Sequence, residues 1–284
     1  AITTKAKQAL IIEFDTGRVL LAKNAETPMH PASMTKMMTA YILFDQLKSG
    51  ILSLDTRFRV SRNAWRKGGS KMFVRVNEDV RIEDLIRGII VQSGNDASIV
   101  VAEGISGSEE NFARDMTEKA HEIGMTNSTF KNASGWPDPE HLTTARDLAT
   151  LIESTIREYP NLYHYYSEKD FIYANIKQYN RNPLLWLNGG ADGLKTGHTD
   201  VAGYGLAASA VRKGRRIVMV INGLKSKKTR TQESEYLLNW AYRTFKSYKL
   251  FSAGECVVFC SVSSLLILSM HPIIGCMPLS KHSL

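Results

Sequence analysis

Three short motifs that could support nucleophilic chemistry occur in order along the chain. They are Ser33-Met34-Thr35-Lys36, Ser93-Gly94-Asn95 and Lys195-Thr196-Gly197. Each motif alone is a weak indication, because residues 128–131 also fit the first pattern and residues 61–63 fit the second. A catalytic site is indicated only if the fold brings the three motifs together.

The first motif has the composition of an activated serine. A serine hydroxyl is a poor nucleophile and needs a general base within hydrogen-bond reach. Lys36 follows Ser33 by three residues, so a helix would place both side chains on one face. A lysine acts as a base only while its amine is neutral, and we expect burial and the positive charge of Lys195 to lower the pKa of Lys36.

A helix over residues 33–48 is predicted to carry this pair. Apolar residues from Met34 to Ile42 recur at the spacing of one helix face, and Pro31 and Gly50 mark the two ends. We expect the methionines on that face to lie in the core.

The other two motifs are predicted to lie at interruptions of regular structure. Ser93-Gly94-Asn95 breaks two predicted helices, over residues 82–91 and 96–104, where side chains can converge on a cleft. Lys195-Thr196-Gly197 leads into a pair of strands, and we expect Gly197 to let a substrate backbone approach the sheet edge closely.

The remaining pattern predicts an α+β fold. Strand signals occur near both ends of the chain with helices between them, so we expect the two ends to share one antiparallel sheet. The predicted strands cover residues 10–14, 19–22, 203–211 and 216–221, and the further helices cover 108–123, 144–157 and 229–248.

Composition limits the classes of function. With 43% apolar and 23% charged residues, the chain is not collagen-like, disordered or a disulfide scaffold. The 36 Lys and Arg against 28 Asp and Glu give a net charge of +8, but the basic run at 225–228 lacks interleaved aromatic residues. We therefore expect no nucleic-acid partner. The chain has no glycine-rich phosphate loop, and we expect no cofactor.

Cysteine usage separates the end of the chain from the rest. Cys256, Cys260 and Cys276 are the only cysteines, so residues 1–255 cannot bind a metal through thiolate, and we expect no metal site there. The chain begins at Ala1 without an apolar signal segment, as expected for an exported protein after processing or for a shortened chain.

Together with their flanks, the three motifs resemble those of penicillin-recognising serine acyltransferases. Within that group the chain is most similar to the D-alanyl-D-alanine carboxypeptidases of the low-molecular-mass penicillin-binding proteins. Residues 31–39, 92–97, 180–186 and 192–200 carry the resemblance, which extends over residues 10–252. It implies the penicillin-binding and serine β-lactamase-like fold, an antiparallel sheet flanked by helices plus a mostly helical subdomain.

The resemblance also implies a role for each motif residue. Ser33 would form an acyl-enzyme with the penultimate D-Ala, with Lys36 as its base and Ser93 passing a proton to the leaving amine. The backbone N–H groups of Ser33 and His198 would hold the oxyanion. The residues implied to bind substrate are Asn95, Arg181, Lys195, Thr196, Gly197 and His198.

The expected activity is removal of the terminal D-Ala from peptidoglycan stem peptides, with penicillins as covalent inhibitors. Peptidoglycan lies outside the cytoplasm, so the expected location is the periplasm or another extracytoplasmic compartment. Family members associate with the inner membrane, but their anchor is not recognisable in this sequence.

Two alternatives stay open. A β-lactamase of this superfamily would use a Glu in an E-x-x-x-N-type loop between the second and third motifs. Glu140, Glu153 and Glu158 lie in that interval, but none has Asn four residues later. A non-catalytic wall-binding module is the other alternative, and the presence of every motif residue argues against it.

We expect a catalytic domain over residues 1–252 and an atypical tail over 253–284. The family usually continues into a β-rich domain and an amphipathic membrane anchor, and the tail matches neither. An altered, out-of-frame end is favoured over a short membrane segment, because the apolar stretch 256–270 is shorter than the roughly 18–20 residues of a spanning helix. A metal site is the third interpretation, but its ligands would be spread through an irregular segment; they are Cys256, Cys260, His271, Cys276 and His282.

Overall fold

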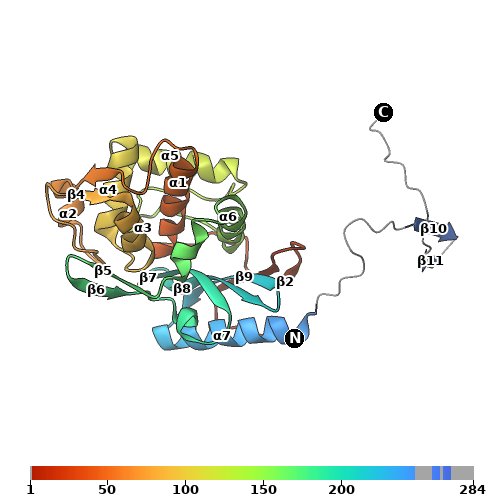
Figure 1. The fold of residues 1–284 in the computed structure, drawn as a ribbon. Helices are drawn as coiled ribbons and strands as arrows, with labels where there is room; N and C mark the ends of the chain where they lie inside the picture. Colours follow the sequence, from red (N-terminus) through yellow and green to blue (C-terminus); the bar gives the residue numbers. More distant parts are fainter. Residues whose placement is uncertain (1, 247–257, 263–264, 270–284) are drawn as a thin grey trace, which may run out of the picture. The chain divides into compact units, whose positions relative to one another are not determined.

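A computed structural model describes residues 2–246, 258–262 and 265–269. The chain divides into two units, residues 1–245 and 246–284, and Figure 1 shows the elements of each.

The first strand is apolar on both faces because it lies inside a sheet. In β1 (Gln8–Glu13), Leu10 and Ile12 face one hydrophobic core, and Ala9 and Ile11 face another. Apolar residues at successive positions of a strand point to opposite faces. The alternation therefore builds a sheet that is covered on both sides.

The sheet has five antiparallel strands in the order β2-β1-β9-β8-β7. Because β1 pairs with β9, the amino-terminal hairpin and the carboxy-terminal strands of the first unit share one sheet, and this prediction is confirmed. The strand β7 forms one edge of the sheet. The bounds of the other strands are β2 (Val19–Lys23), β7 (Ala191–Thr199), β8 (Gly203–Arg212) and β9 (Arg215–Leu224).

Helices cover the two faces unequally. A single long helix, α7, packs its buried Leu237, Leu238 and Ala241 on one face, and the other helices gather over the opposite face (Figure 1). The helices are α1 (Lys36–Lys48), α2 (Arg62–Arg66), α3 (Ile82–Ile90), α4 (Asn95–Ser106), α5 (Glu109–Glu122), α6 (Ala145–Glu158) and α7 (Lys227–Thr244). Shorter elements are the 3₁₀ turns η1 (Ala32–Thr35), η2 (Tyr163–Ser167) and η3 (Pro183–Trp186), and the hairpins β3 (Arg57–Arg59) with β4 (Asp79–Arg81) and β5 (Asp170–Tyr173) with β6 (Ile176–Tyr179).

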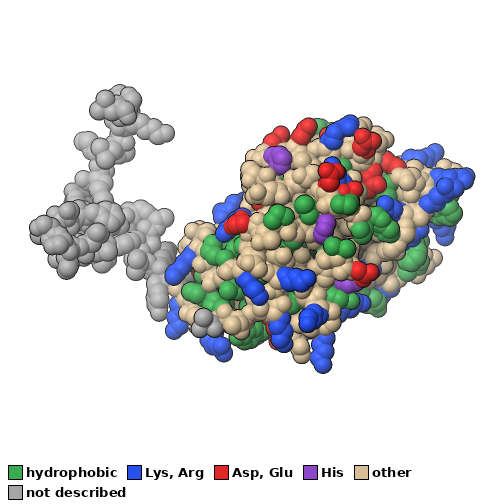
Figure 2. Space-filling view, turned by 180° about the vertical axis from the view of Figure 1, so that it is seen from behind, with side chains coloured by type: hydrophobic (Ala, Val, Ile, Leu, Met, Phe, Trp, Pro, Cys, Tyr) green, Lys and Arg blue, Asp and Glu red, His purple; other side chains and the backbone are tan. Residues whose placement is uncertain are grey.

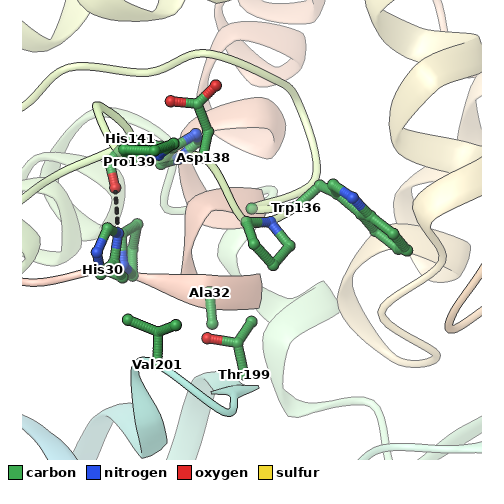
Figure 3. A pocket seen from close by; sticks show the side chains of 11 residues that line it. His30, Ala32, Trp136, Asp138, Pro139, His141, Thr199 and Val201 are labelled. Atoms are coloured by element: carbon green, nitrogen blue, oxygen red, sulfur yellow. Dashed lines mark hydrogen bonds between the residues drawn. The ribbon is translucent and has the colours of Figure 1, made fainter.

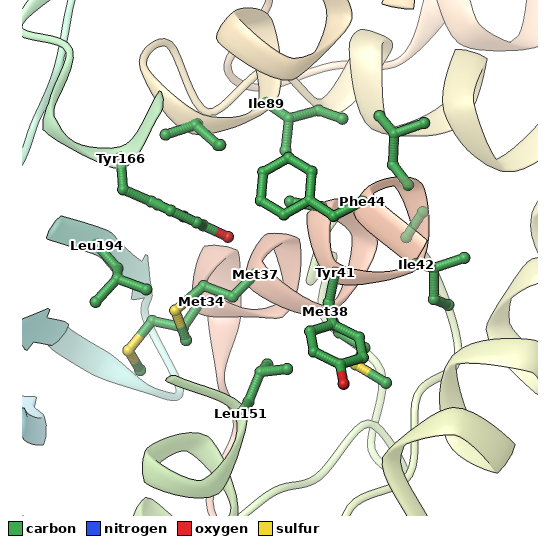
Figure 4. Packing of buried hydrophobic residues seen from close by; sticks show 14 of the residues in the cluster. Met34, Met37, Met38, Tyr41, Ile42, Phe44, Ile89, Leu151, Tyr166 and Leu194 are labelled. Carbon is green, nitrogen blue, oxygen red and sulfur yellow. The ribbon is translucent and has the colours of Figure 1, made fainter. Parts of the chain in front are cut away.

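The methionines that follow Ser33 belong to the larger core, as predicted. Met34, Met37 and Met38 are each at most 1% exposed, and Figure 4 shows them among aromatic and aliphatic side chains from several elements. Tyr41 meets Tyr159 edge-to-face, with ring centroids 5.0 Å apart. This packing fixes the start of α1, and with it the position of the first motif.

The predicted helix over residues 33–48 is divided in the structure. Ala32–Thr35 form the 3₁₀ turn η1, and the α-helix begins at Lys36. The backbone N–H of Lys36 bonds to the carbonyl of Ser33, three residues back, which is the 3₁₀ pattern. The helical start is therefore tighter than the prediction assumed.

The predicted helix over residues 229–248 is also corrected. Ser226 caps the amino terminus by accepting the N–H of Thr229, so α7 begins at Lys227. The helix ends at Thr244, because Phe245 is extended and packs its ring edge-to-face on Trp240.

The second unit contains one described hairpin. Strands β10 (Val258–Val262) and β11 (Leu265–Ser269) pair antiparallel. The expectation of an irregular segment is wrong for these ten residues, because the backbone pairing gives them regular structure. Among the residues that the structure describes, no helix has the length and apolar character needed to cross a membrane.

Charged side chains are distributed over the surface. Figure 2 shows Lys and Arg at many places on one face, interspersed with apolar and acidic side chains, and not gathered into one block. On the face that Figure 2 draws, they form no continuous track of the kind that follows a nucleic-acid backbone.

Candidate active site

Ser33 and Lys36 meet because the chain enters the first helix through a 3₁₀ turn. Side chains three residues apart eclipse in such a turn, and Lys36 Nζ lies 3.1 Å from Ser33 Oγ. Ser33 is partly exposed, whereas Lys36 has no exposed surface. The arrangement offers the hydroxyl to a ligand and shields the amine from water.

Two carbonyl oxygens fix the other contacts of the Lys36 amine. Nζ donates to Asn95 Oδ1 at 2.8 Å and to the backbone carbonyl of Ser134 at 2.6 Å. These oxygens can only accept hydrogen bonds. In the neutral amine both N–H bonds are then used, and the nitrogen lone pair faces Ser33 Oγ.

Burial favours that neutral form. It lowers the pKa of Lys36 from its ordinary 10.5 to about 7, with the positive charge of Arg181 as the second cause. The carboxylate of Asp96 acts in the opposite direction. The cation with the largest effect on Lys36 is therefore Arg181, where the sequence analysis expected Lys195.

The Ser134 carbonyl is aimed by a loop wrapped around a buried amide. Asn132 Oδ1 accepts the backbone N–H groups of residues 134–136, and its Nδ2 donates to the carbonyl of Trp136. Within this loop Gly135 has φ +78°, and a Cβ there would lie 1.8 Å from the carbonyl oxygen of Ala32. The loop therefore packs directly against the 3₁₀ turn η1.

The second motif occupies the break between α3 and α4, as predicted. Ser93 has a left-handed backbone, with φ +64°, and its Oγ accepts a hydrogen bond from Lys195 Nζ at 2.9 Å. Asn95 Nδ2 donates to the carbonyl of Gly68. Both ends of the Asn95 amide are therefore engaged, one by the Lys36 amine and one by the Gly68 carbonyl.

Asp96 stabilises the backbone of residues 72–74, which lie close to the second motif. Its two carboxylate oxygens accept the backbone N–H groups of Met72, Phe73 and Val74. Since the side chain is only 1% exposed, these charge-assisted hydrogen bonds compensate the burial of its charge.

The third motif lies within the edge strand β7 itself. Lys195 is buried, and burial together with the charge of Lys36 holds its pKa well below the ordinary value. A Cβ on Gly197 would lie 2.7 Å from the carbonyl oxygen of Pro31. The absent side chain of Gly197 thus admits the turn that carries Ser33, which the sequence analysis did not foresee.

A cleft of about 480 Å³ opens beside these groups. Three cationic side chains line it, Arg181, Lys227 and Arg230, and no acidic residue of the described chain is among its walls. Ser70 also lines it and accepts a hydrogen bond from Arg181 at 2.7 Å. The predicted residues on its walls are Ser33, Ser93, Arg181, Thr196, Gly197 and His198.

Arg230 is a buried cation that forms no ion pair among the residues that the structure describes. It is 7% exposed, and within the described residues its Nε has no hydrogen-bond partner. Its guanidinium lies 5.9 Å from the centre of the Tyr204 ring, and burial lowers its pKa to about 10. A buried cation facing a cleft is suited to a ligand carboxylate.

The structure brings the motif residues together at one site as two hydrogen-bonded groups, Lys36 with Ser33 and Asn95, and Lys195 with Ser93. Sequence reasoning missed the residues that complete it, namely Ser70, Asn132, Ser134, Tyr204, Lys227 and Arg230. Ser134 acts through its backbone carbonyl, which leaves no side-chain signature. Of these missed residues, only Ser70 had a local signal in the sequence. It follows the pair Gly68-Gly69, which is typical of a place where another segment approaches the backbone closely.

The structure bears on the β-lactamase alternative but does not describe most of the suggested metal ligands of the tail. Glu140 forms an ion pair with Lys131 at 3.0 Å, and neither it, Glu153 nor Glu158 lines the cleft. Among the described residues, no group of three or more His, Cys, Asp and Glu could hold a metal ion. Of the suggested tail ligands, Cys256, His271, Cys276 and His282 lie outside the described residues.

Comparison with known proteins agrees with this geometry. The family model for D-alanyl-D-alanine carboxypeptidase matches residues 1–226. The chain is 39% identical over 257 residues to D-alanyl-D-alanine carboxypeptidase DacA of Haemophilus influenzae, covering 88% of this chain and 65% of the relative. It is 39% identical over 254 residues to DacC of Escherichia coli, covering 87% and 64%. The chain thus spans just under two thirds of the length of these relatives.

Solved structures share the fold. The carboxypeptidase DacD of Francisella tularensis superposes with a TM-score of 0.86 at 33% identity, covering 93% of this chain and 76% of that one. Penicillin-binding protein 5 of Haemophilus influenzae gives 0.83 at 39% identity, covering 86% and 72%. By sequence and by fold, the chain belongs to the D-alanyl-D-alanine carboxypeptidase family.

Proposed function

We propose that the protein is a serine-type D-Ala-D-Ala carboxypeptidase that removes the terminal D-Ala from peptidoglycan stem peptides. One observation carries the proposal: the buried Lys36 amine contacts Ser33 Oγ while two carbonyl oxygens occupy its other hydrogens. Membership of the family supports it. The substrate lies outside the cytoplasm, so we place the protein in an extracytoplasmic compartment.

Acylation begins with proton transfer from Ser33 Oγ to Lys36 Nζ as the oxygen attacks the carbonyl of the penultimate D-Ala. The negative charge that develops on that carbonyl oxygen is held by the backbone N–H groups of Ser33 and His198. The C–N bond then breaks, and the proton that Lys36 took from Ser33 passes through Ser93, whose Oγ accepts a hydrogen bond from Lys195, to the leaving amine. Water finally hydrolyses the Ser33 ester.

The substrate carboxylate binds at the cationic end of the cleft. Arg181 and Arg230 supply positive charge there, and Thr196 offers a hydroxyl from β7. Asn95 contacts the peptide amide through the lone pair or the hydrogen that its bonds to Lys36 and Gly68 leave free. The unprimed half of the substrate lies along β7, beyond Ser33.

Penicillins would acylate the same serine, because the β-lactam carbonyl and the ring carboxylate match these two features. The ampicillin-bound structure of penicillin-binding protein D2 from Listeria monocytogenes, 26% identical with a TM-score of 0.77, supports this part of the proposal. We further propose that the catalytic domain covers residues 1–252 and that residues 253–284 are a separate segment.

The test is D-Ala release from diacetyl-L-Lys-D-Ala-D-Ala, measured with and without prior penicillin, beside turnover of the penicillin itself. We expect D-Ala release that penicillin abolishes, with slow penicillin turnover. Fast penicillin turnover without D-Ala release would instead identify a β-lactamase. Stoichiometric penicillin binding with no D-Ala release would identify a non-catalytic module.

A further inference from the structure

The cleft beside Ser33 carries more positive charge than a terminal D-Ala can neutralise. Arg181, Lys227 and Arg230 line it, and no acidic residue of the described chain does. A terminal D-Ala brings one carboxylate and one methyl group into this space of about 480 Å³. One carboxylate leaves two of the three positive charges in the cleft without a counter-charge.

Two of these cations belong to the first turn of α7, where positive charge is unfavourable. Lys227 and Arg230 are three residues apart, so their side chains are neighbours on one face of the helix. The first turn contains no acidic residue, although the amino end of a helix favours anions over cations. An anionic ligand in the cleft would supply the negative charge that this turn lacks.

Arg230 and Lys227 differ in exposure, and this difference suits them to different anions. Arg230 is 7% exposed, and within the described residues its Nε has no hydrogen-bond partner, so it suits the α-carboxylate of the leaving residue. Lys227 is exposed, and its flexible side chain can follow a group that extends from that residue. The first acidic residue along α7, Glu233, is engaged elsewhere, because its Oε2 accepts hydrogen bonds from Thr4 and Lys5.

The cations lie on one side of Ser33. A second hollow, of about 300 Å³, adjoins the same turn, since Ala32 lines the hollow and Ser33 lines the cleft. The walls of the hollow include Asp138 and no Lys or Arg of the described chain (Figure 3). Of these two spaces, only the cleft offers a cation to a second carboxylate, and the cleft is where the leaving residue binds.

Resting on the proposed function, we propose that Lys227 is a specificity residue that binds a second carboxylate, on the side chain of the leaving D-amino acid. The protein then removes a carboxy-terminal D-residue with an acidic side chain in preference to the uncharged analogue of that residue. The reaction is the same hydrolysis: the C–N bond breaks, and water supplies a hydroxyl to the acyl half and a proton to the leaving amine.

The test compares diacetyl-L-Lys-D-Ala-D-Glu with diacetyl-L-Lys-D-Ala-D-Gln, which have nearly the same shape and differ in one charge. Release of the terminal residue gives kcat/KM for each peptide at low ionic strength. We expect kcat/KM to be about fivefold greater for D-Glu, the effect of one solvent-exposed ion pair of good geometry. The preference should shrink at high salt, which screens such a pair.

Two variants locate the effect. Lys227→Gln should bring the ratio of the two kcat/KM values close to one. Lys228→Gln removes the same charge from an exposed neighbour that does not line the cleft, and should keep most of the preference. Acylation of Ser33 by penicillin checks that each variant is folded.

The role of Lys227 would be overturned by equal kcat/KM values in the unmodified protein, by release of neither D-Glu nor D-Gln, or by an unchanged ratio in Lys227→Gln. An equal loss of preference in Lys228→Gln would also overturn it. In each case the proposed function stands if D-Ala is released from diacetyl-L-Lys-D-Ala-D-Ala. Failure to release that D-Ala would overturn the proposed function and the specificity with it.

Discussion

Lys36 Nζ lies 3.1 Å from Ser33 Oγ on a side chain that has no exposed surface. The lowered pKa and the short distance have one common cause. The enclosure that lowers the pKa of the Lys36 amine also holds that amine beside the Ser33 hydroxyl. A solvated lysine at this distance would stay protonated at neutral pH and could not accept the serine proton. The environment, more than the residue type, suits this lysine to the proposed role of base.

Acylation should follow the titration of Lys36. Its pKa is lowered to about 7, so the neutral base predominates above pH 7 and the ammonium below it. We expect the acylation rate to fall about tenfold per unit below pH 6 and to level off above pH 8. Rates measured by stopped-flow with a reporter β-lactam would check this. Lys36→Arg, which stays charged, should lose acylation, and a midpoint near 10.5 would contradict the assigned base.

Gly135 should be intolerant of a side chain for a local reason. Gly135→Ala would place a Cβ against the Ala32 carbonyl and displace the turn that carries Ser33. The matched control is Gly124→Ala, at φ +94° with open space around it, which should cost about 1–2 kcal/mol of stability without changing the acylation rate. Urea unfolding and penicillin acylation would separate the two effects. Equal acylation by both variants would refute the link between loop and turn.

The acceptor oxygen of Asn132 should matter more than its amide nitrogen. Asn132→Ala leaves three backbone N–H groups without their acceptor, so we expect a loss of about 1–3 kcal/mol in stability and slower acylation as the Ser134 carbonyl moves from Lys36. Asn132→Asp keeps an acceptor and should recover most of the rate. If Ala and Asp behave alike, the loop does not depend on this oxygen.

Arg230 should contribute to recognition of the substrate carboxylate. Arg230→Gln is expected to lower kcat/KM for a D-Ala-D-Ala peptide by about 10–100-fold, the loss of one charge-assisted hydrogen bond. A peptide with an amidated carboxy terminus should show little change. Arg243→Gln, exposed on the same helix, serves as the control. Equal losses for acid and amide would show that Arg230 does not read the carboxylate.

The sequence predicted the parts of the site that act through side chains. Hydroxyl, amine and amide groups belong to particular residue types, which can be recognised in a sequence. The motifs around Ser33, Ser93 and Lys195 do converge. The carbonyl of Ser134 could not be predicted, because every residue has one and only the fold directs it. Arg230 follows the basic run 225–228, lies in a predicted helix and belongs to no motif, and burial in a cleft is a property of the tertiary structure.

The fold was predictable at the level of its sheet and long helices, whose periodic apolar residues are set by burial. The boundaries of these elements were less predictable. The 3₁₀ entry into α1 depends on contacts of Ala32 and Gly197 with segments distant in sequence, and α7 ends early because Phe245 packs on Trp240. Local periodicity contains neither interaction.

The central claim is that Ser33 is the nucleophile, and the most direct measurement locates the covalent adduct of a labelled penicillin. The intact protein is labelled and then digested, and peptide mass spectrometry should find a single adduct, on Ser33. The Ser33→Ala protein should carry none. An adduct on another residue, or undiminished labelling of Ser33→Ala, would contradict the account.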